Sequence, residues 1–261
     1  MGILNVTPDS FHDGGRFDTV QKALDRAQAM ISEGADIIDI GGESTKPGAP
    51  TVPEKEELRR VIPIIQKLVG LSGIPISIDT RKAAVASESI HAGASIINDI
   101  SGLRHDAQMI ELAATSGAGL IVTHMQGTPE TMQNNPRYHC VVTEVIDCFR
   151  ETYRRCLESG INPERLAFDP GIGFGKTLEH NLQLLQSLEQ LLVHDRPIVL
   201  GVSYKSFIGR LLSREEHSAR KAPTIALTAI ARQKGARIFR VHDVRENREA
   251  LVTAEALMNV P

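Results

Sequence analysis

The chain has 261 residues, with 29 Lys and Arg against 32 Asp and Glu, so its formal net charge is −3, and 41% of its residues are hydrophobic. A near-neutral chain without a long basic run does not suit a nucleic-acid groove or an anionic membrane surface. Its apolar runs are far shorter than the ~18 residues that a membrane helix needs. We therefore expect one globular domain over residues 1–261 that binds neither nucleic acid nor a membrane.

The N-terminus lacks a basic segment followed by a longer apolar one, so no signal peptide is readable and we expect a cytoplasmic protein. The three cysteines, Cys140, Cys148 and Cys156, cannot all pair, and none belongs to a Cys-x-x-Cys motif. We interpret them as small packing groups or exposed bystanders. The histidines lack partners at ligand spacing, which argues against a structural zinc site.

Helical periodicity dominates two early segments. The first predicts a helix that is capped by Asp18 or Thr19 and stopped by Gly34. Its apolar face holds Val20, Ala23, Leu24, Ala27 and Ile31. The apolar face of the second holds Leu58, Val61, Ile62, Ile65, Leu68 and Val69.

Short apolar runs rich in β-branched residues alternate with helical segments along the whole chain. We interpret as strands residues 2–6, 37–40, 76–79, 96–99, 120–123, 166–169, 198–202 and 238–241. Their near-continuous apolar character indicates parallel strands that are covered on both faces. Eight strand-then-helix units in this length are typical of an α/β (β/α)8 TIM barrel. A doubly wound open sheet is the alternative fold, but it more often has five or six strands.

A polar residue follows nearly every predicted strand. In chain order these residues are Asn5, Asp39, Asp79, Asn98 with Asp99, Thr123 with His124, Asp169, Ser203 with Lys205, and Arg240 with His242. In a barrel they share the carboxyl-end rim, where active sites lie. Any one of them could instead be a helix cap, and Asp79-Thr-Arg81 could be a cap with its first-turn partner, but the whole series predicts an active site.

The mixture of these groups indicates the ligand. Donors and acceptors that suit a flat heterocycle are Asp79, Asn98, Asp169 and Lys205. Groups that could neutralise a phosphate are Arg240, His242, Lys46 and the amides of Gly41 and Gly42. The polar loops at residues 7–18 and 41–53 are too long for simple turns, and loops of this kind usually carry function.

Of two other motifs, one lacks a required residue and one has two interpretations. The glycine-rich segment 171–177 resembles a P-loop, but Pro170 occupies the position where a glycine is required, so we interpret it as a tight loop. Residues 124–126, which begin with His124, could be catalytic or could anchor a loop.

Seven blocks follow one another from one end of the chain to the other. They are Met1-Gly-Ile-Leu-Asn-Val-Thr-Pro-Asp-Ser-Phe, Asp39-Ile-Gly-Gly-Glu-Ser-Thr-Lys-Pro-Gly, Ile97-Asn-Asp-Ile, His124-Met-Gln-Gly, Asp169-Pro-Gly-Ile-Gly-Phe-Gly-Lys, Ser203-Tyr-Lys-Ser and Arg240-Val-His-Asp-Val. Together these blocks resemble the dihydropteroate synthase family. The resemblance implies a TIM barrel that joins 6-hydroxymethyl-7,8-dihydropterin diphosphate to 4-aminobenzoate, a homodimer and sensitivity to sulfonamides. Family members usually carry a short N-terminal hairpin, whereas this sequence opens on the first strand, so we expect a less covered barrel floor.

The resemblance also implies residue roles. The pterin ring would be held by Asp79, Asn98, Asp169, Lys205 and Arg240, and the catalytic groups would be Asp79, Lys205, Arg240 and His242. The diphosphate would be held by Asn5, Thr45, Lys46, Arg240 and His242, with Asn5 also binding Mg²⁺. The 4-aminobenzoate pocket would be formed by Phe11, Thr45, Pro47, Lys205 and Ser206.

Two positions depart from the family pattern. Lys46 replaces an arginine, and Tyr204 replaces the arginine commonly found between Ser203 and Lys205. Two alternative functions are a pterin-binding methyltransferase, which needs no diphosphate site, and a non-catalytic pterin-binding homologue.

Overall fold

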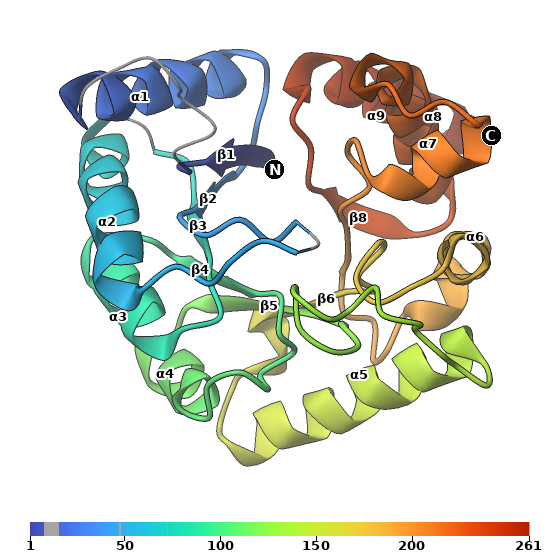
Figure 1. Ribbon diagram of the computed structural model, residues 1–261, viewed down its shortest axis with the longest axis horizontal. Coiled ribbons are helices and arrows are strands. Elements are labelled where there is room, and N and C mark those ends of the chain that lie inside the picture. The colour runs from blue at the N-terminus through green and yellow to red at the C-terminus, as the bar shows by residue number, and fades with distance from the viewer. Residues whose placement is uncertain (8–15, 47, 72, 261) are drawn as a thin grey trace.

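The computed structural model describes residues 1–7, 16–46, 48–71 and 73–260, and its strands form one eight-stranded sheet in the order β1 to β8. Neighbouring strands pair in parallel from β1 to β8. The strands are β1 (Gly2–Asn5), β2 (Ile38–Gly41), β3 (Ile76–Asp79), β4 (Ile96–Asp99), β5 (Gly119–Thr123), β6 (Leu166–Asp169), β7 (Ile198–Leu200) and β8 (Ala236–Phe239). They lie inside a ring of helices (Figure 1).

The two ends of the sheet meet and close the barrel. Gly2 and Val241 form a parallel bridge just after β8. The Ile3 amide donates to the Val241 carbonyl at 2.9 Å, and the Val241 amide donates to the Met1 carbonyl at 3.0 Å. These bonds confirm the (β/α)8 barrel over the doubly wound sheet, because an open sheet leaves the first and last strands unpaired with each other.

Helices follow each strand along the chain, and β7 is followed by two. They are α1 (Arg16–Ser32), α2 (Glu54–Leu71), α3 (Ala83–His91), α4 (Gln108–Ser116), α5 (Val141–Glu158), α6 (Leu178–Gln186), α7 (Ser206–Leu212), α8 (Lys221–Gln233) and α9 (Val244–Met258). Short 3₁₀ turns occupy η2 (Pro163–Arg165), η3 (Leu188–Leu191) and η4 (His217–Arg220). In the described part of the chain, no helix is long and apolar enough to cross a membrane.

The structure corrects two details of the early helices. Helix α1 begins at Arg16. Asp18 and Thr19 therefore lie in its first turn, where these residue types are also tolerated, and neither is its cap. Gly34 does follow its end, at φ +96°. In α2, Val69 is 46% exposed at the edge of the apolar face, whereas Ile64 is fully buried.

The cysteines agree with the interpretation made from their spacing. All three are free: Cys156 is buried, Cys148 is half-buried and Cys140 is exposed.

Alternation along the strands separates two apolar layers. One set of strand residues, which includes Ile40, Ile78 and Ile97, packs outward against the helices. The other set faces the barrel interior, where its amino-terminal layer holds Met1, Ile121, Ala167 and Val199, with Ile37, Ile96 and Ile238 packed against it and partly exposed. The apolar floor therefore comes from residues that precede the polar strand ends by two positions or more.

Candidate active site

The alternation that builds the floor also builds the site above it. Because successive strand side chains point to opposite faces, the residue two positions after an inward-facing one faces inward again. The inward pairs are Ile37 with Asp39, Ile96 with Asn98, Ala167 with Asp169, and Ile238 with Arg240. The polar strand ends therefore point into the barrel at its carboxyl-end rim.

Arg240 is the centre of this polar cluster. Its Nε lies 2.5 Å from Asp39 Oδ2, and its Nη2 lies 2.5 Å from Asp79 Oδ2. Asn98 donates to Asp39 Oδ2 at 3.2 Å. Burial acts to lower the pKa of Arg240, but Asp39 and Asp79 raise it above its ordinary value. The guanidinium is thus charged and fixed in orientation.

Asp39 holds this cluster together, although the sequence predicted no role for it beyond its place at a strand end. It is fully buried, and its carboxylate holds both Arg240 and Asn98. A signal was present, because a carboxylate inside an apolar strand must find a partner when it is buried. The identity of that partner follows only from the closure of β8 onto β1.

Asp79 has unused hydrogen-bonding capacity. Its Oδ2 accepts from Arg240, whereas its buried Oδ1 has no partner among the described residues. Burial raises the pKa of Asp79 well above its ordinary value, although Arg240 acts to lower it. A buried acceptor without a partner is costly, so a ligand with an N–H donor would be favoured here.

Asp169 and Lys205 complete the interior. Asp169 Oδ1 accepts from the Gly171 amide at 2.7 Å, and burial raises the pKa of this carboxyl. Lys205 Nζ lies 3.8 Å from the centre of the Phe174 ring. Burial lowers the pKa of Lys205 to about 8, although Asp169 acts to raise it. Gly173, at φ +83°, lets the lysine stem pass, since a Cβ there would lie 3.1 Å from Lys205 Cδ.

The glycine-rich segment is therefore a tight loop that shapes the site, as its failed P-loop spacing predicts. Within this loop, the buried Lys176 side-chain nitrogen lies 3.0 Å from His124 Nδ1 and donates to the Phe174 carbonyl at 3.0 Å. Burial lowers the pKa of His124 to about 3. These contacts favour the interpretation of His124 as a loop anchor.

His242 is held by Ser203 through both its backbone and its ring. The Ser203 hydroxyl oxygen accepts from the His242 amide at 3.2 Å and lies 2.9 Å from Nδ1 of the ring. Burial, and then Arg240, lowers the pKa of His242 to about 4, so the ring is neutral at pH 7. Because Ser203 contacts Nδ1, Nε2 is the ring nitrogen left to contact a ligand.

Tyr204, one of the two departures from the family pattern, lies next to this histidine. Its backbone is left-handed, at φ +57°, and its ring stacks on His217 with 4.2 Å between the centres. Its hydroxyl donates to Asp243 at 2.5 Å. The Tyr204 side chain is thus fixed by His217 and Asp243.

The structure places the remaining predicted residues less completely. Asn5 lies at the end of β1, where its Oδ1 and Asp79 Oδ2 are 3.7 and 3.6 Å from the position of a Cβ on Gly41. Thr45 is half-buried and Lys46 is exposed, and neither side chain makes a hydrogen bond or ion pair within the described residues. Ser206 is exposed as the first residue of α7. Phe11 and Pro47 lie outside the described residues.

The structure therefore brings together Asp79, Asn98, Asp169, Lys205 and Arg240, with Asn5 and His242 beside them. Within the described residues, the side chains of Thr45, Lys46 and Ser206 make no hydrogen bond or ion pair with this cluster. Asp99, also a strand end, is structural: it accepts from the amides of Ser101 at 2.7 Å and Leu103 at 3.0 Å.

Comparison with known proteins matches this geometry to a family. Residues 1–242 match the model of the family described as pterin binding enzyme. The chain is 46% identical over 259 residues to the dihydropteroate synthase of Escherichia coli, an alignment that covers 99% of this chain and 91% of that protein. This chain belongs to the dihydropteroate synthase family.

Solved dihydropteroate synthases share the whole fold. A Yersinia pestis dihydropteroate synthase in complex with a sulfonamide drug superposes with a TM-score of 0.93 at 46% identity, covering 100% of this chain and 94% of that one. A Xanthomonas albilineans dihydropteroate synthase in complex with 7,8-dihydropteroate superposes with a TM-score of 0.90 at 39% identity, with the same coverage. The TIM barrel expected from the family is therefore confirmed.

Proposed function

We propose that this chain condenses 6-hydroxymethyl-7,8-dihydropterin diphosphate with 4-aminobenzoate to give 7,8-dihydropteroate and pyrophosphate, as a transferase of folate biosynthesis. The observation that carries this function is the buried Asp79 Oδ1, which has no hydrogen-bond partner among the described residues and lies in a cluster of acidic and basic groups. A flat heterocycle with several N–H donors is a ligand that satisfies such an acceptor. Membership in the dihydropteroate synthase family supports the reaction.

The pterin ring would occupy the barrel interior between Asp79, Asn98, Asp169 and Lys205, with Arg240 packed on its face. Three observations support this placement. The carboxylates offer acceptors, Asn98 and Lys205 offer donors, and the Arg240 plane is fixed before any ligand arrives. A site fixed in advance costs less conformational entropy when it binds.

The diphosphate would lie at the rim, where Arg240, His242, Thr45 and Lys46 provide charge and donors. Neutral His242 would donate from Nε2, because Ser203 occupies Nδ1. Mg²⁺ prefers oxygen ligands, so the side-chain oxygen of Asn5 would suit this ion. The described residues hold no cluster of three His, Cys, Asp or Glu ligands, and the substrate phosphates would supply most of the other oxygens. When bound, the ion would offset charge on the departing pyrophosphate.

The residues of the chain would mainly position the reactants and stabilise charge. The C–O bond breaks with its electron pair leaving on pyrophosphate, which Arg240, Lys46 and His242 stabilise. The electron-rich dihydropterin stabilises the methylene cation left behind. The 4-aminobenzoate nitrogen then forms the C–N bond, and the resulting anilinium gives its proton to solvent water. Because an anilinium is acidic, no strong base is needed. The 4-aminobenzoate would lie between Phe11, Pro47, Thr45, Lys205 and Ser206.

We also propose that residues 1–261 form one domain, that the protein works in the cytoplasm and that it is a homodimer. The test of the function is direct product analysis. Purified protein with both substrates and Mg²⁺ should release pyrophosphate and 7,8-dihydropteroate in equal amounts. A methyltransferase would instead demethylate methyltetrahydrofolate, and a non-catalytic homologue would bind the pterin without turnover.

A further inference from the structure

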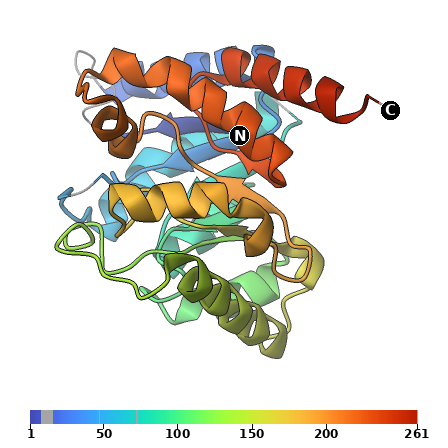
Figure 2. The same cartoon turned by 90° about the vertical axis from the view of Figure 1, so that its right-hand side faces the viewer.

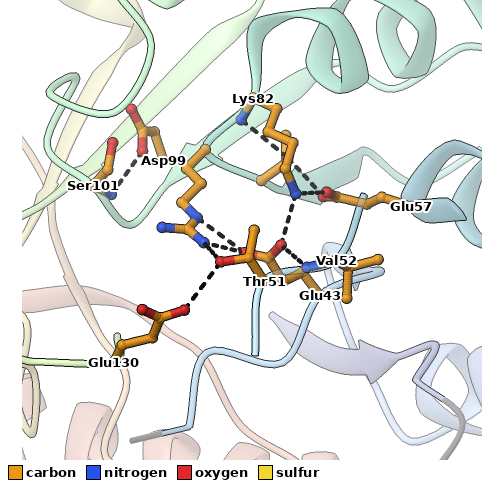
Figure 3. Close-up of polar contacts among 10 residues, drawn as sticks. Glu43, Thr51, Val52, Glu57, Lys82, Asp99, Ser101 and Glu130 are labelled. Carbon is orange, nitrogen blue, oxygen red and sulfur yellow. Dashed lines mark hydrogen bonds and ion pairs between the residues drawn. The ribbon is translucent and has the colours of Figure 1, made fainter. Parts of the chain in front are cut away.

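A buried carboxylate joins the two ends of the loop between β2 and α2 (Figure 3). Glu43 begins this loop, and its side chain is only 7% exposed. Its Oε2 accepts from the Val52 amide at 2.8 Å, nine residues later. Thr45 and Lys46, the two loop residues assigned to the diphosphate, lie between these tied positions.

Two cations following Asp79 hold the same carboxylate. Arg81 Nε donates to Glu43 Oε1 at 2.9 Å, and Lys82 Nζ donates to Glu43 Oε2 at 2.7 Å. Burial acts to raise the pKa of Glu43, but hydrogen bonds from Lys82 and Val52 lower it below its ordinary value. The start of the loop is thus tied to the segment that carries the pterin-facing Asp79.

The network continues into α2 and balances its own charge. Glu57 is fully buried and accepts from Lys82 at 2.5 Å and from the Thr80 hydroxyl at 2.7 Å. Two carboxylates, Glu43 and Glu57, therefore face two cations, Arg81 and Lys82. Removing one charge from such a buried set leaves another uncompensated, so each member matters to the geometry of the rest.

A second set of contacts holds the far part of the loop. Arg81 Nη2 donates to Thr51 Oγ1 at 3.2 Å, and that hydroxyl lies 3.3 Å from Glu130 Oε1 in the loop after β5. The Gly48 amide donates to the Pro129 carbonyl at 3.1 Å. Hydrogen bonds at Gly48 and Thr51 therefore hold the part of the loop that follows Lys46. The Lys46 side chain itself is exposed and can meet a ligand.

We propose that Glu43 is a positioning residue that, through Val52, Arg81 and Lys82, holds the Thr45–Lys46 segment where it meets the diphosphate. It does not touch substrate. The inference rests on the proposed function, since it takes the diphosphate as the partner of Lys46. It adds a physical link between the pterin subsite, which ends at Asp79, and the anion subsite.

A double-mutant cycle separates this role from general stabilisation. Glu43→Gln keeps the side-chain shape and removes the charge. We expect it to raise the KM for the pterin diphosphate about tenfold and to leave the Kd of the pterin alcohol, which has no charged group, unchanged. When Glu43→Gln is added to Lys46→Ala, it should raise the KM for the pterin diphosphate little further, because the lysine side chain that Glu43 positions is already absent.

Controls make each outcome decisive. Glu56→Gln alters a neighbouring surface carboxylate that pairs with Arg59 and Arg60, so it should change neither constant. If thermal unfolding shows that Glu43→Gln does not fold, Thr51→Val replaces it, because this variant removes only the loop hydroxyl. Thr51→Val should raise the KM for the pterin diphosphate by a smaller factor and leave the Kd of the pterin alcohol unchanged. Hydrogen exchange at the Val52 amide should speed up in Glu43→Gln and not in Glu56→Gln.

Equal weakening of alcohol and diphosphate, or fully additive losses in the double variant, would overturn the inference. A failure of the proposed function has a different signature. The parent protein would then release no pyrophosphate from the two substrates, whatever the behaviour of Glu43→Gln.

Discussion

Lys46 is the residue at which the anion subsite departs from the family pattern. An ammonium is a single flexible charge, whereas a guanidinium offers two parallel donors to a phosphate. We predict that Lys46→Arg keeps or improves turnover and that Lys46→Ala impairs it, mainly through a higher KM for the diphosphate substrate. Steady-state kinetics and calorimetry with the pterin alcohol check this. Equal losses of affinity for both ligands would show that the residue serves the loop alone.

Lys176 predicts a measurable pH dependence of stability. Burial lowers its pKa from 10.5 to about 7, although Asp169 acts to raise it. Between pH 7 and 10 the unfolded lysine therefore binds more protons than the folded one, so the free energy of unfolding rises with pH. From pH 7 to 9 the rise should be about 2 kcal/mol, since one pKa unit is worth about 1.4 kcal/mol.

Urea unfolding of the parent and of Lys176→Met over this pH range measures the difference. The variant should lack the contribution of about 2 kcal/mol from this position and keep the part of the rise above about pH 8 that comes from Lys205, whose pKa burial also lowers. Parallel stability curves for the two proteins would show that Lys176 titrates at its ordinary pKa in the fold.

Among the elements, α2 packs closely against the backbone of Gly42, the residue that follows β2. A Cβ on Gly42 would lie 2.8 Å from Val61 Cγ1 and 2.9 Å from Glu57 Cγ. We predict that Gly42→Ala lowers the free energy of unfolding by about 1–3 kcal/mol, the usual range for overpacking. Gly70→Ala in the same helix meets open space and should be neutral or slightly stabilising. Equal effects of the two variants in urea unfolding would contradict this packing.

The strands were the most predictable elements. The boundaries expected from sequence at residues 76–79, 96–99 and 166–169 agree with β3, β4 and β6, because apolar runs end there at a carboxylate. Others shift by one or two residues: β8 ends at Phe239 rather than at residue 241, and β7 ends at Leu200 rather than at residue 202. Ladder pairing with the neighbouring strand sets these ends, and one sequence does not reveal that pairing.

The site was predictable where it depends on strand ends and less so where it depends on partners. Asp79, Asn98 and Asp169 follow from the barrel pattern alone. The Asp39–Arg240 pair joins residues 201 positions apart, and the Glu43–Lys82 pair joins residues 39 positions apart. Such pairs become visible only when the tertiary fold brings distant segments together.

At the scale of the whole molecule, α8 and α9 pack side by side (Figure 2). Several apolar side chains on these two helices are exposed. The exposed fractions are 49% for Ile230, 56% for Val252, 65% for Leu257 and 45% for Met258. Since exposed apolar patches often mark interfaces, we predict that this face forms the homodimer. Val252→Glu should convert a dimer to a monomer in sedimentation experiments, whereas Val69→Glu on α2 should not. A parent protein that is monomeric at all concentrations would contradict the prediction.

The central claim is that the interior cluster of the barrel binds the pterin ring, and Asp169 tests it most directly. Asp169→Asn can still accept from the Gly171 amide, so the loop is kept while the charge beside Lys205 is removed. Calorimetry of a dihydropterin with the parent and this variant should show binding weakened by about 1–3 kcal/mol, which is roughly 5- to 150-fold in Kd. Equal affinity in the two proteins would place the pterin elsewhere and contradict the account.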